Sequence, residues 1–344
     1  MSHPESIKRP LKIFLGATAI TLLLLGLIYF RTVFVAAAVA MIGGVLLEPL
    51  IRWLRVRCRL PHGVSVAITA LLLFCGVGGV LYTGYRLIAG QIHRLVEQGP
   101  QIKEALLGKA EQLIRQFSWL GFDGKELKLG EHVQHVANGA MKVLTVGIEG
   151  LSYTLLVMML MLFIAANFHD YGRGFLTLFP IAKRPRLALL GRGSIRVVRS
   201  WFFGQIIVVS ITAVMTAGAL LGIGMDYWLL IAALTIILDF IPFIGAILTG
   251  LVAVLLTLGT EPEKAGWVLL AYIVIQQLES DVILPLVMKG RVKMPEAHLL
   301  IFVLIMAAAF GLIGVFLSPP VFAVLHYLYV QAYIPWVEQR PPRA

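Results

Sequence analysis

The strongest restriction on the fold of this chain is a series of apolar segments long enough to cross a lipid bilayer. A spanning helix needs about 20 mostly apolar residues. Segments of that kind are 11–30, 33–51, 64–88, 143–168, 200–222 and 265–288. Only 14% of the 344 residues are charged and 59% are hydrophobic, whereas soluble domains have about 25% and 45–50%. The sequence therefore predicts an all-α polytopic membrane protein.

Two further apolar segments, 227–258 and 298–334, are too long for a single crossing. Both contain helix-breaking residues near the middle. These are Asp239, Pro242 and Gly245 in the first segment, and Gly311, Gly314, Pro319 and Pro320 in the second. Irregular backbone at membrane depth persists only where protein or a cavity covers it. We therefore expect about eight membrane segments, two of them broken or re-entrant.

The distribution of basic residues predicts the orientation of the chain, because cytoplasmic loops carry an excess of Lys and Arg. Lys8, Arg9 and Lys12 precede the first span, and the loops after the second and fourth spans are rich in arginine. Both termini are therefore expected in the cytoplasm. If the two long segments fold back as hairpins, the basic loop 289–293 is cytoplasmic as well.

Residues 91–142 differ from the membrane segments. Their apolar residues recur at helical spacing, and seven Lys/Arg are balanced by six Asp/Glu. This pattern predicts an extramembrane amphipathic helical layer. The expected parts of the chain are the N-terminal membrane helices 1–90, this layer 91–142, the fourth span with a basic cytoplasmic loop 143–199, a C-terminal membrane region 200–334, and the tail 335–344.

The C-terminal region repeats the order of a span followed by a broken segment. If the broken segments are hairpins, the first pair begins inside and the second begins outside, which makes an inverted repeat. Paired segments interrupted by Gly or Pro indicate the binding site of a secondary transporter. We therefore expect a transport site between the two broken segments.

Carboxylates within the apolar segments are the candidates for ion coupling. They are Asp239, Glu279 and Asp281. Inserting a charged side chain into the membrane costs about 2.5–3.5 kcal/mol, and such groups usually face a cavity or a partner. Gln276 and Gln277 accompany the last two, and Pro285 should loosen the same helix. Two alternatives remain: Asp239 caps a helix beginning at Pro242, and Glu279 pairs with a basic residue near the cytoplasmic end.

Several other classes of function are not favoured by the sequence. It contains no HExxH, no GxSxG and no Walker A motif, so we expect no enzyme activity and no nucleotide site. No CxxC occurs, and His93, His132 and His135 lack a fourth donor, so neither a metal nor a cofactor is expected. The net charge of +11 is explained by membrane orientation, and not by nucleic-acid binding. Any transport must therefore be driven by gradients.

Short motifs in the C-terminal half resemble the AI-2E transporter family. They are "WFFGQ" at 201–205, "LGIGMDYWLL" at 221–230, "LDFIPFIGAI" at 238–247 and "QLESDVILPLVMKGRV" at 277–292. Family positions are matched by Gly204, Gln205, Asp239, Pro242, Gly245, Glu279, Pro285 and Gly290. Ala246 stands where the family usually has a second proline, so the identity of the substrate is not carried over.

The resemblance implies a bacterial inner-membrane protein that forms homo-oligomers, pentamers among them. It also implies export of autoinducer-2 or, in some members, sodium or lithium/proton antiport, and it adds Gln205 to the site candidates. Three hypotheses follow. The chain exports a small polar metabolite, exchanges sodium for protons, or serves as a non-transporting membrane scaffold. Only the scaffold has no need of buried carboxylates at membrane depth, so their burial discriminates between these hypotheses.

Overall fold

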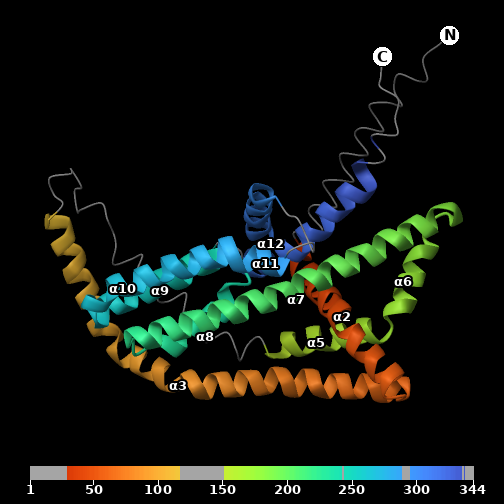
Figure 1. The fold of residues 1–344 in the computed structure, drawn as a ribbon. Coiled ribbons are helices and arrows are strands. Elements are labelled where there is room, and N and C mark those ends of the chain that lie inside the picture. The colour runs from red at the N-terminus through yellow and green to blue at the C-terminus, as the bar shows by residue number, and fades with distance from the viewer. Residues whose placement is uncertain (1–28, 117–150, 242–243, 289–294, 335–336, 338–344) are drawn as a thin grey trace, which may run out of the picture.

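The computed structural model describes residues 29–116, 151–241, 244–288, 295–334 and 337 (Figure 1). Most of the first expected span and residues 117–142 lie outside these ranges. Every regular element of the described residues is a helix, and five helices are long and apolar enough to cross a membrane, or six if the bent pair α5–α6 is one span. The prediction of an all-α polytopic membrane protein is therefore confirmed.

The first half of the described chain contains a few long helices. In order they are α2 (Arg31–Arg57), α3 (His62–Gln116), α5 (Leu151–Ala166), α6 (Phe168–Thr177) and the short η2 (Ile181–Lys183). Helices α2 and α5 pack closely, because a side chain at Gly43 or Gly44 would overlap Met161 or Ile164. After α5 the chain bends by 74° into α6.

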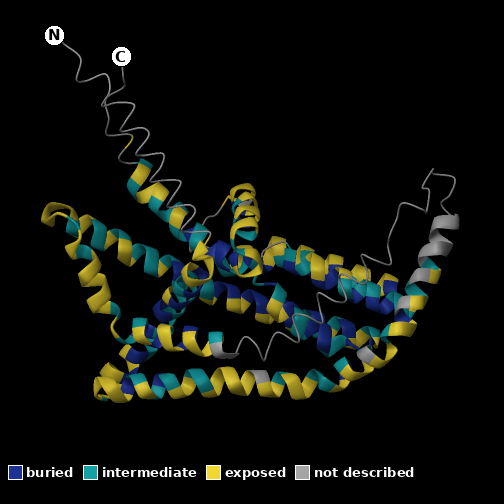
Figure 2. Ribbon diagram, turned by 180° about the vertical axis from the view of Figure 1, so that it is seen from behind, coloured by how far each residue is buried: buried dark blue, intermediate teal, exposed yellow. Residues whose placement is uncertain are grey.

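In the second half, two long helices alternate with the two broken segments. In order they are α7 (Arg184–Ile223), α8 (Trp228–Leu238), α9 (Ile244–Thr260), α10 (Pro262–Leu278), η3 (Glu279–Ile283), α11 (Leu284–Met288), α12 (Glu296–Leu328) and η4 (Tyr329–Tyr333). Buried residues concentrate on α7 to α10, whereas α3 is mostly exposed (Figure 2).

Helix α3 runs along one side of the molecule and turns around the start of α8 and the end of α9 (Figure 1). It passes residue 90 without interruption, so the domain boundary expected there is not a break in secondary structure. Ile92, Ile102 and Leu106 pack against α8 and α9. The Gln91 Oε1 atom accepts a hydrogen bond of 2.7 Å from the backbone N–H of Leu230, so α3 caps the start of α8.

The first broken segment is a helical hairpin of α8 and α9. The Thr257 hydroxyl at the end of α9 lies 3.6 Å from the sulfur of Met225, just before α8. Ile231 near the start of α8 shares a cluster with Leu256 near the end of α9, which an antiparallel pair requires. The turn is tight, since a Cβ at Gly245 would overlap the carbonyl of Leu238.

The second broken segment also folds back. Gly311 interrupts α12 with φ 65° and ψ −150°, a backbone conformation available almost only to glycine. Phe302 and Phe322 would be about 30 Å apart in a straight helix, yet their ring centroids are 5.5 Å apart. A Cβ at Gly314 would overlap the carbonyl of Met306. The expected hairpins are therefore both present.

The two hairpins enter from opposite ends of an antiparallel pair of long helices. The Lys264 Nζ atom at the start of α10 donates to the carbonyl of Gly224 at the end of α7, so α10 and α11 run back toward the basic start of α7. The base of the second hairpin lies at that start, where Tyr327 contacts Gly193. Ile241, at the tip of the first hairpin, packs against Val303 and Val315 of the second. The order of span and hairpin is thus repeated with inversion.

Candidate functional site

The tip of the first hairpin places Asp239 inside the molecule. Asp239 is 4% exposed and follows the last residue of α8. Its backbone carbonyl accepts a 2.8 Å hydrogen bond from Gln205 Nε2 of α7. Neither carboxylate oxygen has a hydrogen-bond partner within the described residues. Asp239 therefore ends α8, and no bond among the described residues supports the alternative that it caps the following helix.

Glu279 faces the same region from the end of α10. In the part of the chain that the structure describes, its buried Oε2 atom has no hydrogen-bond partner, and its charge is close enough to act on Asp239. Among the described residues no Lys or Arg forms an ion pair with either carboxylate. The alternative of a Glu279 ion pair thus finds no support within those residues.

The backbone at Glu279 is a π-helix, η3, with a local cause. Pro285 has no N–H to offer the carbonyl of Asp281, and its ring crowds that carbonyl. The Leu284 N–H donates to the carbonyl of Glu279, five residues earlier, which is the π pattern. Single π-helical turns inside α-helices occur frequently at functional sites. Pro285 therefore loosens this helix, as the sequence predicted.

Buried hydroxyl groups surround the two carboxylates. Thr212 neighbours Glu279, and Thr235 and Thr249 neighbour the Tyr272 hydroxyl. These threonines are at most 2% exposed, and each donates its hydroxyl hydrogen to the carbonyl four residues earlier. Their remaining lone pairs are free to accept. The hydroxyls of Tyr272 and Thr216 are buried without a hydrogen-bond partner.

Together these groups form what we call the oxygen cluster. Its members are Gln205 and Thr212 of α7, Thr235 of α8, Asp239 directly after α8, Thr249 of α9, Tyr272 of α10 and Glu279 of η3. A buried polar group without a partner lowers stability by about 1–3 kcal/mol. An apolar interior with several such oxygens is therefore suited to a proton, a cation or a hydroxyl-bearing solute.

The remaining sequence candidates lie outside this cluster or outside the described residues. Gln276 is half-buried and donates to the Ser280 hydroxyl at 3.3 Å. Gln277 and Asp281 are exposed, so the structure separates Asp281 from Glu279. Pro242 and Gly290 are not among the described residues.

The backbone carbonyl that Pro319 leaves unpaired in the second hairpin has a side-chain partner. Pro319 has no N–H for the carbonyl of Val315, and the Ser318 hydroxyl donates to that carbonyl at 2.7 Å instead. Ser318 and Pro319 are fully buried. Proline is therefore tolerated here because a neighbouring hydroxyl satisfies the backbone that it leaves unpaired.

Sequence reasoning missed the threonines and Tyr272. A usable signal was present, because Thr212 and Thr216, and likewise Thr235 and Asp239, are four residues apart in apolar helices and so share a face. Tyr272 and Glu279 are seven residues apart, which is also one face. Polar residues at this spacing on neighbouring spans would have indicated a common interior.

The long apolar helices, the two inverted hairpins and the buried oxygen cluster define a multi-pass α-helical membrane protein with the architecture of a transporter. The family model described as AI-2E family transporter matches residues 18–333. This chain therefore belongs to the AI-2E transporter family, as the motifs indicated.

Two curated relatives match most of the chain. "Putative transport protein MT0215" of Mycobacterium tuberculosis is 28% identical over 305 residues, which cover 86% of this chain and 81% of the relative. "Putative transport protein YrrI" of Bacillus subtilis is 21% identical over 308 residues, which cover 87% and 86%. Both names describe transport, and neither names a substrate.

Proposed function

We propose that this protein is a gradient-driven secondary transporter that exports a small polar solute of the autoinducer-2 type across a bacterial inner membrane. The observation that carries the proposal is a pair of carboxyl groups, the buried Asp239 and the half-buried Glu279. Both Asp239 oxygens and Oε2 of Glu279 are buried without a hydrogen-bond partner among the described residues. An isolated buried carboxylate is strongly disfavoured, so this pair needs a proton or a cation. No nucleotide motif competes with a gradient as the source of energy.

The oxygen cluster supplies the two functions that export requires. Asp239 and Glu279 take up and release the coupling proton. The hydroxyls of Thr235, Thr249 and Tyr272 offer acceptors to a solute with several hydroxyl groups. Gln205 holds the Asp239 backbone through its 2.8 Å bond. The residue that takes up the proton is therefore also the residue through which α7 holds the hairpin tip.

The test is pH-gradient-driven flux in proteoliposomes with wild type, Asp239→Asn and Glu279→Gln. Each substitution keeps the shape of the side chain and removes its charge, so we expect the folded yield to be retained and coupled flux to fall at least about tenfold. The matched control is Asp281→Asn, because Asp281 is exposed and only two residues from Glu279. The control should keep wild-type flux.

Two results would contradict the proposal. Wild-type flux with unchanged pH dependence in both cluster variants would make the carboxyls structural. Equal loss in the Asp281→Asn control would mean that the flux responds to charge at the membrane surface. Thermal unfolding of each variant, recorded in the same preparation, separates loss of transport from loss of fold.

Sodium or lithium/proton antiport is the second candidate. Carboxylate and hydroxyl oxygens are ligands that hard cations accept, and the cluster contains no nitrogen donor other than the Gln205 amide. If antiport is the activity, an outward sodium gradient should drive protons inward and acidify the vesicle lumen without any solute present. If solute export is the activity, pH change should require the solute.

Orientation and assembly are further parts of the proposal. We propose that both termini and the loop after Met288 lie in the cytoplasm. We also propose that the protein is a homo-oligomer, a pentamer by resemblance. The exposed apolar residues of α3, such as Leu71, Leu72 and Val80, favour a contact between subunits through the first spans. Cys58 and Cys75 are free and exposed, so labelling requires their removal.

Labelling tests the orientation. In a cysteine-free background, Lys289→Cys should resist an impermeant maleimide applied from outside, and strong labelling would contradict the placement.

Native mass spectrometry in detergent tests assembly, and a spectrum with monomer alone would contradict it.

A further inference from the structure

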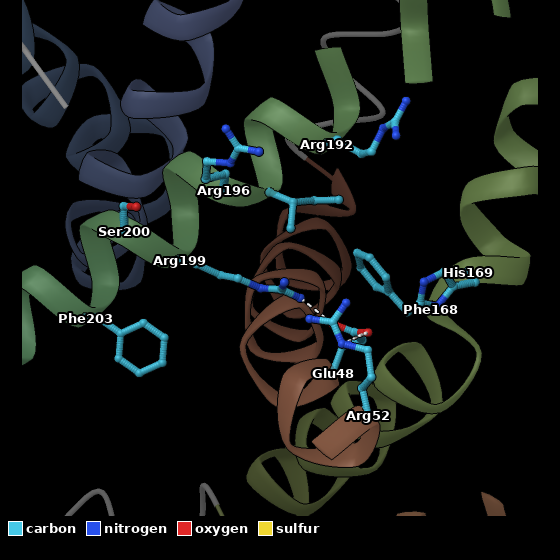
Figure 3. Close-up of a pocket in the computed structure, with 10 residues that line it drawn as sticks. Glu48, Arg52, Phe168, His169, Arg192, Arg196, Arg199, Ser200 and Phe203 are labelled. Carbon is cyan, nitrogen blue, oxygen red and sulfur yellow. Dashed lines mark hydrogen bonds and ion pairs between the residues drawn. The ribbon is translucent and has the colours of Figure 1, made fainter. Parts of the chain in front are cut away.

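A basic pocket lies apart from the oxygen cluster, between α2, α6 and the start of α7. Its volume is about 590 Å³, and its walls include Arg52, Arg192, Arg196, Arg199 and the single carboxylate Glu48 (Figure 3). Four arginines against one glutamate leave three positive charges in excess. The pocket is therefore built to attract an anion.

The acidic residue in the pocket is already neutralised. The Arg199 Nη2 atom lies 2.7 Å from Glu48 Oε2, and its Nε donates to the carbonyl of Val45 at 2.9 Å. Arg52 Nε is a further 3.7 Å partner of Glu48. Glu48 is 5% exposed, so its carboxylate is enclosed beside these two arginines. The charge of Glu48 is thus not available to the other arginines.

Arg192 and Arg196 remain exposed on the same helix, one turn apart. Figure 3 shows both on α7, away from the Glu48 ion pairs, with their guanidinium groups pointing in different directions. Arg192 Nε donates to the carbonyl of Ala188 at 3.3 Å, which leaves its two terminal nitrogens free. Among the described residues neither arginine has a carboxylate partner. Two guanidinium groups are therefore available to one anion.

The pocket lies where the chain passes from water to hydrocarbon. Helix α7 has 40 residues, about twice the length that crosses a bilayer, and its continuous apolar stretch begins near Trp201. Phe203, on the pocket wall, is 53% exposed. Tyr171 and Phe175 of α6, the helix that contributes Phe168 and His169 to the pocket, are 56% and 57% exposed, as in helices that lie in the membrane interface.

We propose that this pocket binds the phosphate group of an anionic phospholipid. Arg192 and Arg196 supply the guanidinium groups that bind it, because guanidinium groups match phosphate oxygens with paired hydrogen bonds. The acyl chains continue along Phe203 into the hydrocarbon. Basic pockets between membrane helices on the cytoplasmic side bind anionic headgroups in this way. The same chemistry would accept a soluble phosphate, so the experiment separates the two sources.

The experiment uses the full-length protein, purified in detergent and depleted of lipid. Its thermal unfolding midpoint is measured with phosphatidylglycerol, with phosphatidylcholine and with inorganic phosphate at equal phosphorus concentration. The variants are Arg192→Gln with Arg196→Gln, and the control Arg186→Gln, which removes one exposed arginine of α7 outside the pocket.

Phosphatidylglycerol should raise the midpoint of wild type and of the control, and the double variant should need at least about tenfold more lipid for the same shift. Inorganic phosphate should have little effect; if it stabilises wild type as strongly as phosphatidylglycerol, the ligand is a soluble anion and the lipid assignment is overturned. An unchanged lipid response in the double variant overturns the site. Should the double variant not fold, the single variants Arg192→Gln and Arg196→Gln replace it, each with an expected loss of about threefold or more.

Discussion

Both helical hairpins have a glycine close to an earlier carbonyl, but their tips lie in opposite surroundings. In each, a glycine presses against a carbonyl seven or eight residues earlier, Gly245 against Leu238 and Gly314 against Met306. The tip of the first hairpin is buried and carries Asp239. The tip of the second carries Leu312 and Ile313, which are 54% and 45% exposed.

This difference indicates where ion chemistry can lie. A carboxylate is tolerated at membrane depth only when protein or a water-filled cavity surrounds it, and the first tip has that surrounding. The tip is also held by a side-chain bond from Gln205 of α7, whereas Gln91 of α3 holds the base of the same hairpin. The second hairpin supplies an apolar wall against Ile241. Similar backbone geometry thus supports two different roles.

The largest effect is expected from a methyl group at the buried tip. In Gly245→Ala the new Cβ would overlap the Leu238 carbonyl and lie 2.8 Å from the Asp239 Cα, so we expect a loss of about 3 kcal/mol. Gly311→Ala meets no atom within 4 Å and should lose about 2 kcal/mol through its backbone conformation alone. Thermal unfolding in detergent ranks the two, and the reverse order would contradict the comparison.

Removing the bond between α7 and the first tip should have the next largest effect. Gln205→Ala leaves the buried Asp239 carbonyl without its donor, which should lower the free energy of unfolding by about 2 kcal/mol. The matched control is Gln277→Ala, an exposed glutamine, with a loss within about 0.5 kcal/mol. Equal losses in chemical-denaturant or thermal unfolding would mean that the tip does not depend on this bond.

The bond between α3 and the first hairpin can be tested separately. Gln91→Ala leaves the Leu230 N–H at the start of α8 unpaired, because the first N–H groups of a helix have no partner within it. The expected loss is about 1.5 kcal/mol. Hydrogen exchange should also quicken at Leu230. Gln101→Ala, exposed on the same helix, is the control, and a similar effect there would make the loss one of helix propensity.

The smallest effect is expected in the second hairpin. Ser318→Ala removes the donor to the Val315 carbonyl that Pro319 leaves unpaired, for a loss of about 1 kcal/mol. Ser210→Ala removes an exposed serine bond to a carbonyl that is four residues earlier, and should change stability little. If the two variants have the same unfolding midpoint, the Val315 carbonyl has another partner.

Much of the fold could be predicted from the sequence. The segments of α2, α3, α7 and α10 were expected from apolar length, and the breaks at Asp239–Gly245 and Gly311–Gly314 from residues that disturb a helix. These signals are local, because apolar length and helix breaking depend on neighbours along the chain. The continuation of α3 through residue 90 was not expected, since a change from apolar to amphipathic composition need not interrupt a helix.

The candidate site could be predicted only in part. Asp239 and Glu279 were found because a carboxylate within an apolar segment is rare and unfavourable. Thr235 and Thr249 were missed because threonine satisfies its own hydroxyl within a helix, so its presence in an apolar segment needs no explanation. Glu279 and Asp281 looked equivalent in sequence, although two residues of a helix point in different directions.

The sequence by itself determined that the chain is a bundle of membrane helices, where two of its segments break, and which carboxylates are unfavourable in lipid. Only the tertiary structure decided that the hairpins enter from opposite ends, that Glu279 and not Asp281 faces Asp239, and that Arg199 neutralises Glu48. The physical reason is that insertion and helix breaking are summed over adjacent residues, whereas these pairings depend on how each helix is rotated and packed against helices distant in sequence.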